Sequence, residues 1–349
     1  MRDQIPRQRG SRALLTLAAL IVMIAGLRAA QAIVVPFLLS VFLAMLGVPL
    51  LTRLRRLGVP RGIAIVLVVL AMGSLLVAVG SVVATALNAF TVEIPRYQAR
   101  MFVLITSVQD SLAARGIEVS IREEVARLFD PRQMVLWGGD LLSGVASIVS
   151  TTVLVVLTVI FMLSEAAGLP AKIRAAFGPS NGRRLELSGV VTQVHRYLII
   201  KTMISLITGL LLGVWVWVLG VDFPVLWGLT AFVLNYIPNI GSILAAVPPT
   251  VLGLIQPDGG VALCLAVIAG YLTVNIVVGS LLEPTWMGER LGLSTLVVFL
   301  SLVFWGWVWG AVGMLLSVPL TMVAKILLQN SDELRWIAVL MGKPPSEAQ

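Results

Sequence analysis

The sequence predicts an all-α polytopic membrane protein, and three observations support this prediction. Hydrophobic residues make up 58% of the chain and charged residues only 12%, whereas a soluble domain is about half apolar and a quarter charged. Apolar runs of about 18 or more residues recur, each long enough to cross a bilayer. Two further apolar stretches are interrupted at their centres. We therefore expect about eight membrane segments, comprising six full spans and two broken, re-entrant helical hairpins, together with a small helical external segment.

The charge and the cysteine content exclude several classes of protein. The net charge is +8, but the basic residues lie in short connections between apolar spans, where they set membrane orientation. No basic run is interleaved with aromatic residues, so we expect no nucleic-acid partner. The single cysteine, Cys264, and the single histidine, His195, cannot build a metal centre. We expect no cofactor, no metal site and no catalytic residues.

The first half of the chain is predicted to be three membrane spans followed by an external segment. Arginines before the first span and in the connection Thr52–Arg61 place the N-terminus in the cytoplasm. One helical face of the external segment contains Tyr97, Met101 and Leu104. The segments are 1–92 (three spans), 93–140 (external, amphipathic and helical), 141–164 (fourth span) and 165–201 (cytoplasmic, basic and helical).

The second half is predicted to be a transport core, residues 202–327, followed by a cytoplasmic tail, 328–349. Two charge-free stretches in the core, 223–257 and 291–324, contain Asn, Gly and Pro near their centres. Proline breaks a helix, and in hydrocarbon such a break must face protein or a water-filled cavity. Each stretch is also short of the about 40 residues that two full spans need. Two half-helices meeting at Asn235–Gly241 are therefore expected in the first stretch, and the span between the stretches, 259–282, is expected to be uninterrupted.

Each broken stretch follows a span, and the two units start on opposite sides of the membrane. Such an inverted repeat is typical of secondary transporters, which hold their substrate where two broken helices approach each other. The alternative is plain spanning helices that are kinked at Gly and Pro, which are common in membrane segments.

Four runs of residues resemble the autoinducer-2 exporter family of bacterial membrane proteins. They are L-N-Y-I-P-N-I-G-S (234–242), L-E-P (282–284), M-G-E-R-L-G-L-S (287–294) and F-W-G-W-V-W-G (304–310). The resemblance implies a multi-span permease of the bacterial inner membrane with cytoplasmic termini. It implies export of a small polar solute such as autoinducer-2 by alternating access, or alternatively sodium (lithium)/proton antiport on the same scaffold.

The candidate transport residues lie at the breaks and at one span end. Polar side chains at membrane depth are costly and tend to be functional, although Asn also caps helices and Glu283 is alternatively a solvated boundary charge. The substrate or ion pathway is predicted at Asn235, Pro238, Asn239, Gly241, Asn275, Glu283, Gly310 and Gly313, and gating or coupling at Glu283, Glu289 and Arg290.

Two other functional classes were weighed against transport. An intramembrane hydrolase needs a nucleophile and base, or two carboxylates, at membrane depth, and no charge-free span offers them. A membrane scaffold would use the external segment 93–140 as its working surface. We expect the partners to be the lipid bilayer, a small polar solute with Na⁺ or H⁺, and further copies of the chain in a homo-oligomer.

Overall fold

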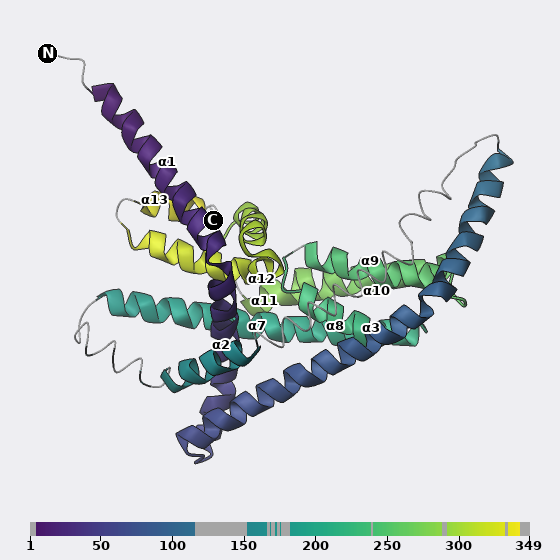
Figure 1. The fold of residues 1–349 in the computed structure, drawn as a ribbon, viewed down its shortest axis with the longest axis horizontal. Coiled ribbons are helices and arrows are strands. Elements are labelled where there is room, and N and C mark those ends of the chain that lie inside the picture. The colour runs from purple at the N-terminus through teal and green to yellow at the C-terminus, as the bar shows by residue number, and fades with distance from the viewer. Residues whose placement is uncertain are drawn as a thin grey trace, which may run out of the picture.

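The computed structural model describes residues 5–115, 152–165, 168, 172, 175, 182–238, 240–287, 292–331 and 334–342. These residues form helices joined by turns, with no strand among them. The helices are α1 (Ile5–Ala29), α2 (Gln31–Arg56), α3 (Arg61–Ala113), an unlabelled helix at Thr152–Glu165, α7 (Gly182–Val218), α8 (Pro224–Leu234), α9 (Ile240–Ile255), α10 (Val261–Val274), the π-helix η1 (Asn275–Leu282), α11 (Glu283–Met287), α12 (Thr295–Gln329) and α13 (Arg335–Leu340). Figure 1 shows α7 to α10 gathered side by side, while α1 and the far end of α3 extend away from them.

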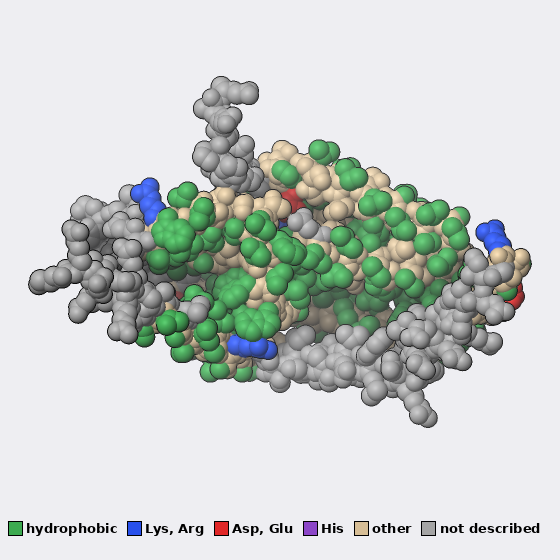
Figure 2. All heavy atoms as spheres, turned by 90° about the horizontal axis from the view of Figure 1, so that it is seen from above, with side chains coloured by type: hydrophobic (Ala, Val, Ile, Leu, Met, Phe, Trp, Pro, Cys, Tyr) green, Lys and Arg blue, Asp and Glu red, His purple; other side chains and the backbone are tan. Residues whose placement is uncertain are grey.

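The helices have the length and surface of membrane spans. Five of them are long and apolar enough to cross a bilayer, namely Gln31–Arg56, Arg61–Ala113, Thr192–Val218, Val261–Trp286 and Thr295–Gln329. On the face drawn in Figure 2, hydrophobic side chains are spread over the described helices and few charged ones appear. A contiguous apolar surface of this extent is compatible with hydrocarbon and not with water. The prediction of an all-α polytopic membrane protein is confirmed.

Helix α3 is much longer than the predicted third span. Its 53 residues extend about 80 Å, whereas the hydrocarbon core of a bilayer is about 30 Å thick. The helix continues through the expected boundary at 92/93 and through Pro95 to Ala113. The predicted face of Tyr97, Met101 and Leu104 packs against a buried cluster that includes residues of α8, α9 and α10. The beginning of segment 93–140 is thus joined to the core by packing.

The first broken stretch is a helical hairpin, which we call the first hairpin (α8, α9 and the turn between them). Helix α8 ends at Leu234 and α9 begins at Ile240, so the predicted break is present. The two arms extend about 16 and 24 Å, and neither crosses the bilayer alone. The Gln256 side chain, just after α9, donates to the Gly220 carbonyl and accepts from the Asp222 N–H, both before α8. The chain therefore enters and leaves the hairpin at the same end.

The second broken stretch folds back in the same way within α12, and we call it the second hairpin. The backbone leaves helical geometry at Trp309 and Gly310, where Gly310 has φ 62°, a conformation that glycine adopts easily. The indole N–H of Trp305 donates to the hydroxyl of Thr321 at 3.1 Å. In an unbroken helix these residues would lie about 24 Å apart along the axis. The Lys325 ammonium donates to the Gly292 carbonyl, so this hairpin is also fastened where it opens.

The two hairpins share a tip geometry and point in opposite directions. A Cβ on Gly241 would lie 1.8 Å from the Leu234 carbonyl oxygen, and one on Gly313 would lie 1.9 Å from that of Trp305. Only glycine permits either approach. The open end of the first hairpin lies beside Val221, just past the C-terminal end of α7. The open end of the second hairpin packs instead against the N-terminal half of α7, where Leu293 and Met322 join a cluster with Val194 and Leu198.

The span predicted to be uninterrupted, 259–282, changes its winding at Asn275. Eight residues, Asn275–Leu282, are π-helical, and the Glu283 N–H bonds to the Val278 carbonyl five residues earlier. Pro284 follows, and its missing N–H removes an α-helical bond at this point. The predicted span is present as one continuous helical segment, Val261–Trp286, and its residues Asn275–Leu282 are wound as a π-helix. Short π-helical segments inside α-helices frequently mark functional sites.

The predicted terminal and connecting segments are described only in part. The fourth span, 141–164, is represented by Thr152–Glu165, which packs against α2 and α3. The described part of the tail 328–349 includes α13. Met341 follows α13, and its carbonyl accepts a hydrogen bond from the Ser294 N–H at 3.0 Å. Residues 116–140, 343–349 and most of 166–181 lie outside the described part of the chain.

We predict that Gly228→Ala destabilises the fold, because α7 and α8 touch through their backbones. A Cβ on Gly228 would lie 2.8 Å from the Gly209 carbonyl oxygen and 3.0 Å from the Gly213 Cα. Overpacking of this kind costs about 1–3 kcal/mol, measurable as a lower thermal unfolding midpoint in detergent. Gly80→Ala in α3 is the matched control, since nothing lies within 4 Å of its Cβ position. Equal midpoints for the two variants would contradict the backbone contact.

Candidate functional site

The polar face of α7 is the centre of the candidate site. Lys201, Ser205 and Thr208 are three and four residues apart and therefore share one face of the helix. Their exposed fractions are only 3%, 0% and 5%, although they lie within the apolar span Thr192–Val218. Ser205 is the central residue of that 27-residue span. Buried polar groups at this depth need partners from neighbouring helices.

The tip of the first hairpin supplies partners for this face. The Asn235 amide nitrogen donates to the Ser205 hydroxyl oxygen at 3.0 Å. The Tyr236 hydroxyl donates to the Thr202 hydroxyl oxygen at 2.7 Å, and Thr202 donates to the Leu198 carbonyl. Asn235 also stands at the C-terminal end of α8, with its N–H on the Ala231 carbonyl. The tip of a re-entrant hairpin is thus joined by side-chain hydrogen bonds to the middle of a spanning helix.

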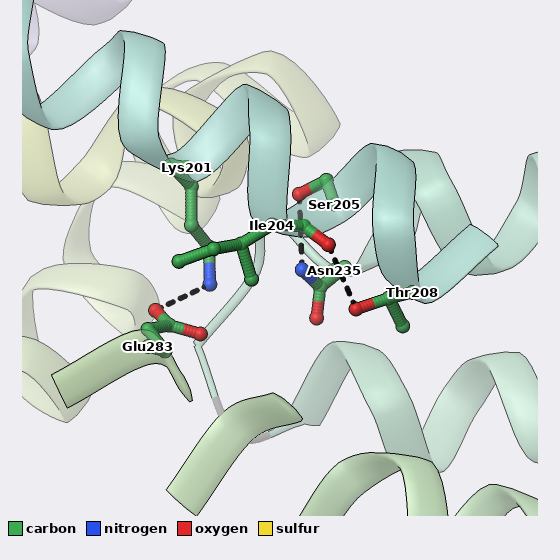
Figure 3. A network of polar contacts seen from close by, with 6 residues as sticks. All are labelled: Lys201, Ile204, Ser205, Thr208, Asn235 and Glu283. Carbon is green, nitrogen blue, oxygen red and sulfur yellow. Dashed lines mark hydrogen bonds and ion pairs between the residues drawn. The ribbon is translucent and has the colours of Figure 1, made fainter. Parts of the chain in front are cut away.

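An ion pair lies one helical turn away on the same face. The Lys201 ammonium lies 2.7 Å from a Glu283 carboxylate oxygen. The side chain of Lys201 is 4% exposed and that of Glu283 is 23% exposed. Figure 3 shows this pair and the Asn235–Ser205 bond below the same stretch of α7, with Thr208 bonded to the Ile204 carbonyl. Glu283 opens α11, directly after the π-helical segment.

The ion pairs that the structure describes differ in their surroundings. Lys201–Glu283 joins two helices in the packed core. The other two, Arg96–Glu93 and Lys172–Glu165, have side chains that are 38% to 69% exposed. A buried charge is expensive to leave without its partner. Lys201–Glu283 is therefore the charged interaction that a change in α7–α11 packing would disturb most.

The predicted site residues fall into separate places. Asn235, Pro238 and Gly241 lie at the tip of the first hairpin. Glu283 lies at the start of α11, in the ion pair with Lys201 of α7. Asn275 begins the π-helical segment, with its amide oxygen near Gly279. Gly310 and Gly313 lie at the tip of the second hairpin. Asn239, Glu289 and Arg290 lie outside the described residues.

The tip of the second hairpin makes polar contacts with α1. The Trp309 indole donates to the Leu27 carbonyl at 3.1 Å, and the Arg28 guanidinium lies 4.8 Å from the Trp307 ring centre. Trp305 and Trp309 stack with their ring centres 4.8 Å apart. These tryptophans thus tie the second break to the N-terminal helices, whereas the first break is tied to α7.

Sequence reasoning missed the α7 half of the site. The predicted boundary between the cytoplasmic segment 165–201 and the core falls inside α7, which is continuous from Gly182 to Val218. Lys201 therefore belongs to the core. The spacing of Lys201, Ser205 and Thr208 was the available signal, because polar residues three and four apart in an apolar run share a face.

The described residues contain no group of three or more His, Cys, Asp or Glu side chains placed to hold a metal ion. The chemistry available at α7 is that of hydroxyls, one carboxamide and one carboxylate–ammonium pair. This set can bind a small hydroxylated solute and can exchange a proton at the carboxylate.

Known proteins match nearly the whole chain. The family model for the AI-2E family transporter matches residues 17–333. The AI-2 transport protein TqsA of Escherichia coli (strain K12) is 41% identical over 337 residues, which cover 95% of this chain and 96% of that protein. The putative transport protein YhhT of the same organism is 38% identical over 340 residues, 97% and 96% of the two chains. A putative transport protein of Haemophilus influenzae is 38% identical over 336 residues, 95% and 96% of the two chains. The chain therefore belongs to the AI-2E family of transporters.

Proposed function

We propose that this chain is a secondary transporter that exports a small, uncharged, hydroxylated solute of the autoinducer-2 kind by alternating access. The observation that carries the proposal is the polar contact between the first hairpin's tip and the middle of α7. A polar site at mid-depth, next to a broken helix, is where secondary transporters bind their substrates. The name of the 41% identical relative, an AI-2 transport protein, supports the substrate class.

The donor and acceptor groups around α7 favour an uncharged solute. Ser205, Thr202 and Tyr236 contribute hydroxyls, and Asn235 contributes a carboxamide. The charges of Lys201 and Glu283 neutralise each other, so the site presents no net charge to a ligand. Hydroxyl groups of a solute can replace the internal hydrogen bonds one for one, which limits the cost of opening the network.

We place the protein in the bacterial inner membrane with both termini in the cytoplasm. The basis is a group of arginines in the last turn of α2 and at the start of α3, since the ends of spans beside short cytoplasmic connections are enriched in basic residues. These are Arg53, Arg55, Arg56 and Arg61. The lipid bilayer is the partner of the exposed apolar helix faces. We expect a homo-oligomer, because apolar helical faces also serve as contacts between copies.

We predict that Asn235→Ala lowers autoinducer-2 flux about tenfold, the effect of losing about 1.4 kcal/mol in the limiting step. The substitution removes the bond from the hairpin tip to Ser205. Flux is measured in proteoliposomes loaded with autoinducer-2, with equal amounts of inserted protein. Asn88→Ala is the matched control, because Asn88 lies exposed on α3. Equal flux in the two variants would remove the proposed site.

The tips themselves supply a second prediction. Gly241→Ala and Gly313→Ala each place a methyl group within 2 Å of a carbonyl oxygen, so the tip must shift. We expect each variant to insert in the membrane and to lose about tenfold or more in flux. Gly80→Ala serves again as the control. Wild-type flux in both tip variants would show that the glycine contacts at the breaks do not matter for transport.

Sodium (lithium)/proton antiport is tested in the same vesicles. A sodium or lithium gradient is imposed without autoinducer-2, and the internal pH is followed with a trapped dye. Cation-driven pH changes that appear without any autoinducer-2 flux would replace the export proposal with the antiport one. Autoinducer-2 flux in wild-type vesicles without such pH changes supports export.

A further inference from the structure

We propose that Glu283 is the group for which a proton and the exported solute compete, with Lys201 as the internal cation that keeps the carboxylate ionised when neither is bound. This inference rests on the proposed function and adds to it the identity of the coupling ion and the residue that takes it. The observations that carry it are the burial of the pair, its position one turn from the hairpin contact, and its place after a π-helical segment.

The geometry gives the two partners unequal access to water. Lys201 is 4% exposed and its ammonium is in contact with one Glu283 oxygen at 2.7 Å. Glu283 is 23% exposed, and in Figure 3 its second carboxylate oxygen takes no part in the pair. A proton arriving from water therefore reaches the carboxylate side.

The proton step is simple to balance. A proton from water forms an O–H bond at Glu283, the carboxylate becomes a neutral carboxylic acid, and the ion pair to Lys201 is lost. The Lys201 ammonium then needs another acceptor. Ser205 lies four residues away on the same face, about one turn along α7, and Asn235 is bonded to it. On proton release the O–H bond breaks and the ion pair forms again.

The solute is expected to favour the ionised state. A solute hydroxyl that donates to a carboxylate makes a charge-assisted hydrogen bond, which is roughly twice as strong as a neutral one. A protonated Glu283 offers a weaker acceptor. Solute and proton therefore weaken each other's binding by the same factor, as linkage requires. Competition of this kind is the condition for exchanging an inward-moving proton for an outward-moving solute.

Other titratable groups lie on the helices packed around Glu283. On α7, which packs against α11, Lys201 pairs with the carboxylate and Tyr197 lies near it. His195 also stands on α7, and its Nε2 atom is buried without a hydrogen-bond partner among the described residues. Tyr236, at the hairpin tip, lies near Tyr197, and its hydroxyl donates a hydrogen bond to Thr202.

Glu283 directly follows the π-helical segment, and a change in the winding of that segment would change the contact between Glu283 and Lys201. The N–H of Glu283 bonds five residues back, so the orientation of Glu283 about the helix axis depends on the winding of Asn275–Leu282. A return to α-helical winding would turn Glu283 relative to α7. Loss of the ion pair upon protonation removes a contact that opposes such a turn.

The test compares exchange with gradient-driven transport in proteoliposomes. Autoinducer-2 is placed on both sides for exchange, and on one side with an imposed pH gradient for net transport. We expect the pH gradient to accelerate wild-type net transport about tenfold, within the usual range of coupling. Glu283→Gln is expected to lose the acceleration, and its exchange is expected to need about tenfold more autoinducer-2 to reach the same rate, because the neutral amide is the weaker acceptor.

Controls separate coupling from folding. Glu165→Gln removes another carboxylate that pairs with a lysine, Lys172 at 2.5 Å, whose hydrogen bond holds the pKa of Glu165 below its ordinary value; this variant should retain the acceleration. The double variant Lys201→Met/Glu283→Gln removes both charges, so no unpaired ammonium stays buried. It should also exchange autoinducer-2 without responding to the pH gradient.

Each result decides between named outcomes. Three results would overturn this inference and leave the export proposal standing. The first is exchange in the wild type without a response to the pH gradient. The second is a response that survives in Glu283→Gln and in the double variant, and the third is acceleration by sodium in place of protons. No exchange in the wild type would overturn both.

Discussion

A broken helix inside a bilayer has peptide groups that lipid cannot solvate, and the whole core of this protein is arranged around that constraint. In the first hairpin, α8 ends at Leu234, level with the middle of the spanning helix α7. The next two residues, Asn235 and Tyr236, donate hydrogen bonds to hydroxyls on α7. Without Ser205 and Thr202 in these positions, the tip would carry polar groups into an apolar layer. The polar face of α7 and the break in the hairpin are therefore two halves of one feature.

Backbone packing positions these two halves. Gly209 and Gly213 of α7 allow α8 to approach so closely that a Cβ on Gly228 would meet α7 backbone atoms at 2.8 and 3.0 Å. Small residues serve this purpose in membrane helices, where packing replaces the hydrophobic driving force. Hydrogen bonds between membrane helices contribute only about 0.6 kcal/mol each on average. The glycines thus set the position of the hairpin, and the polar bonds satisfy its tip.

The sequence alone predicts both helix breaks. Of the site, it predicts the residues of the hairpin tip and Glu283, but not the polar face of α7. Asn, Pro and Gly at the centre of a charge-free stretch favour a break that faces protein over a helix exposed to hydrocarbon, so the turn after Leu234 and the interruption at Trp309 and Gly310 follow from local chemistry. Lys201 does not, because a lysine next to an apolar run resembles a boundary charge. Only Glu283, 82 residues away in sequence, gives it a buried partner. The π-helical winding of Asn275–Leu282 produces no recognisable pattern of hydrophobic residues. Pro284, which cannot donate an α-helical hydrogen bond, is the one local feature that indicates it. The polar segment that begins at Glu93 predicted the end of a span, yet α3 continues through Pro95, and its Tyr97 face packs against the core.

The two hairpins are alike in geometry and unlike in chemistry. Both are fastened at their open ends and both depend on a glycine at the tip, which is what an inverted repeat requires. Their partners differ: the first tip contacts hydroxyls and lies one turn from an ion pair, whereas the second donates an indole N–H to the Leu27 carbonyl of α1. That carbonyl lies in the last turn of α1, where helical carbonyls lack partners of their own. The second hairpin thus stabilises the C-terminal end of α1. The groups able to bind a solute or exchange a proton lie at the tip of the first hairpin and on α7. The two hairpins thus share a tip geometry, while the hydroxyls and the buried ion pair are concentrated on α7.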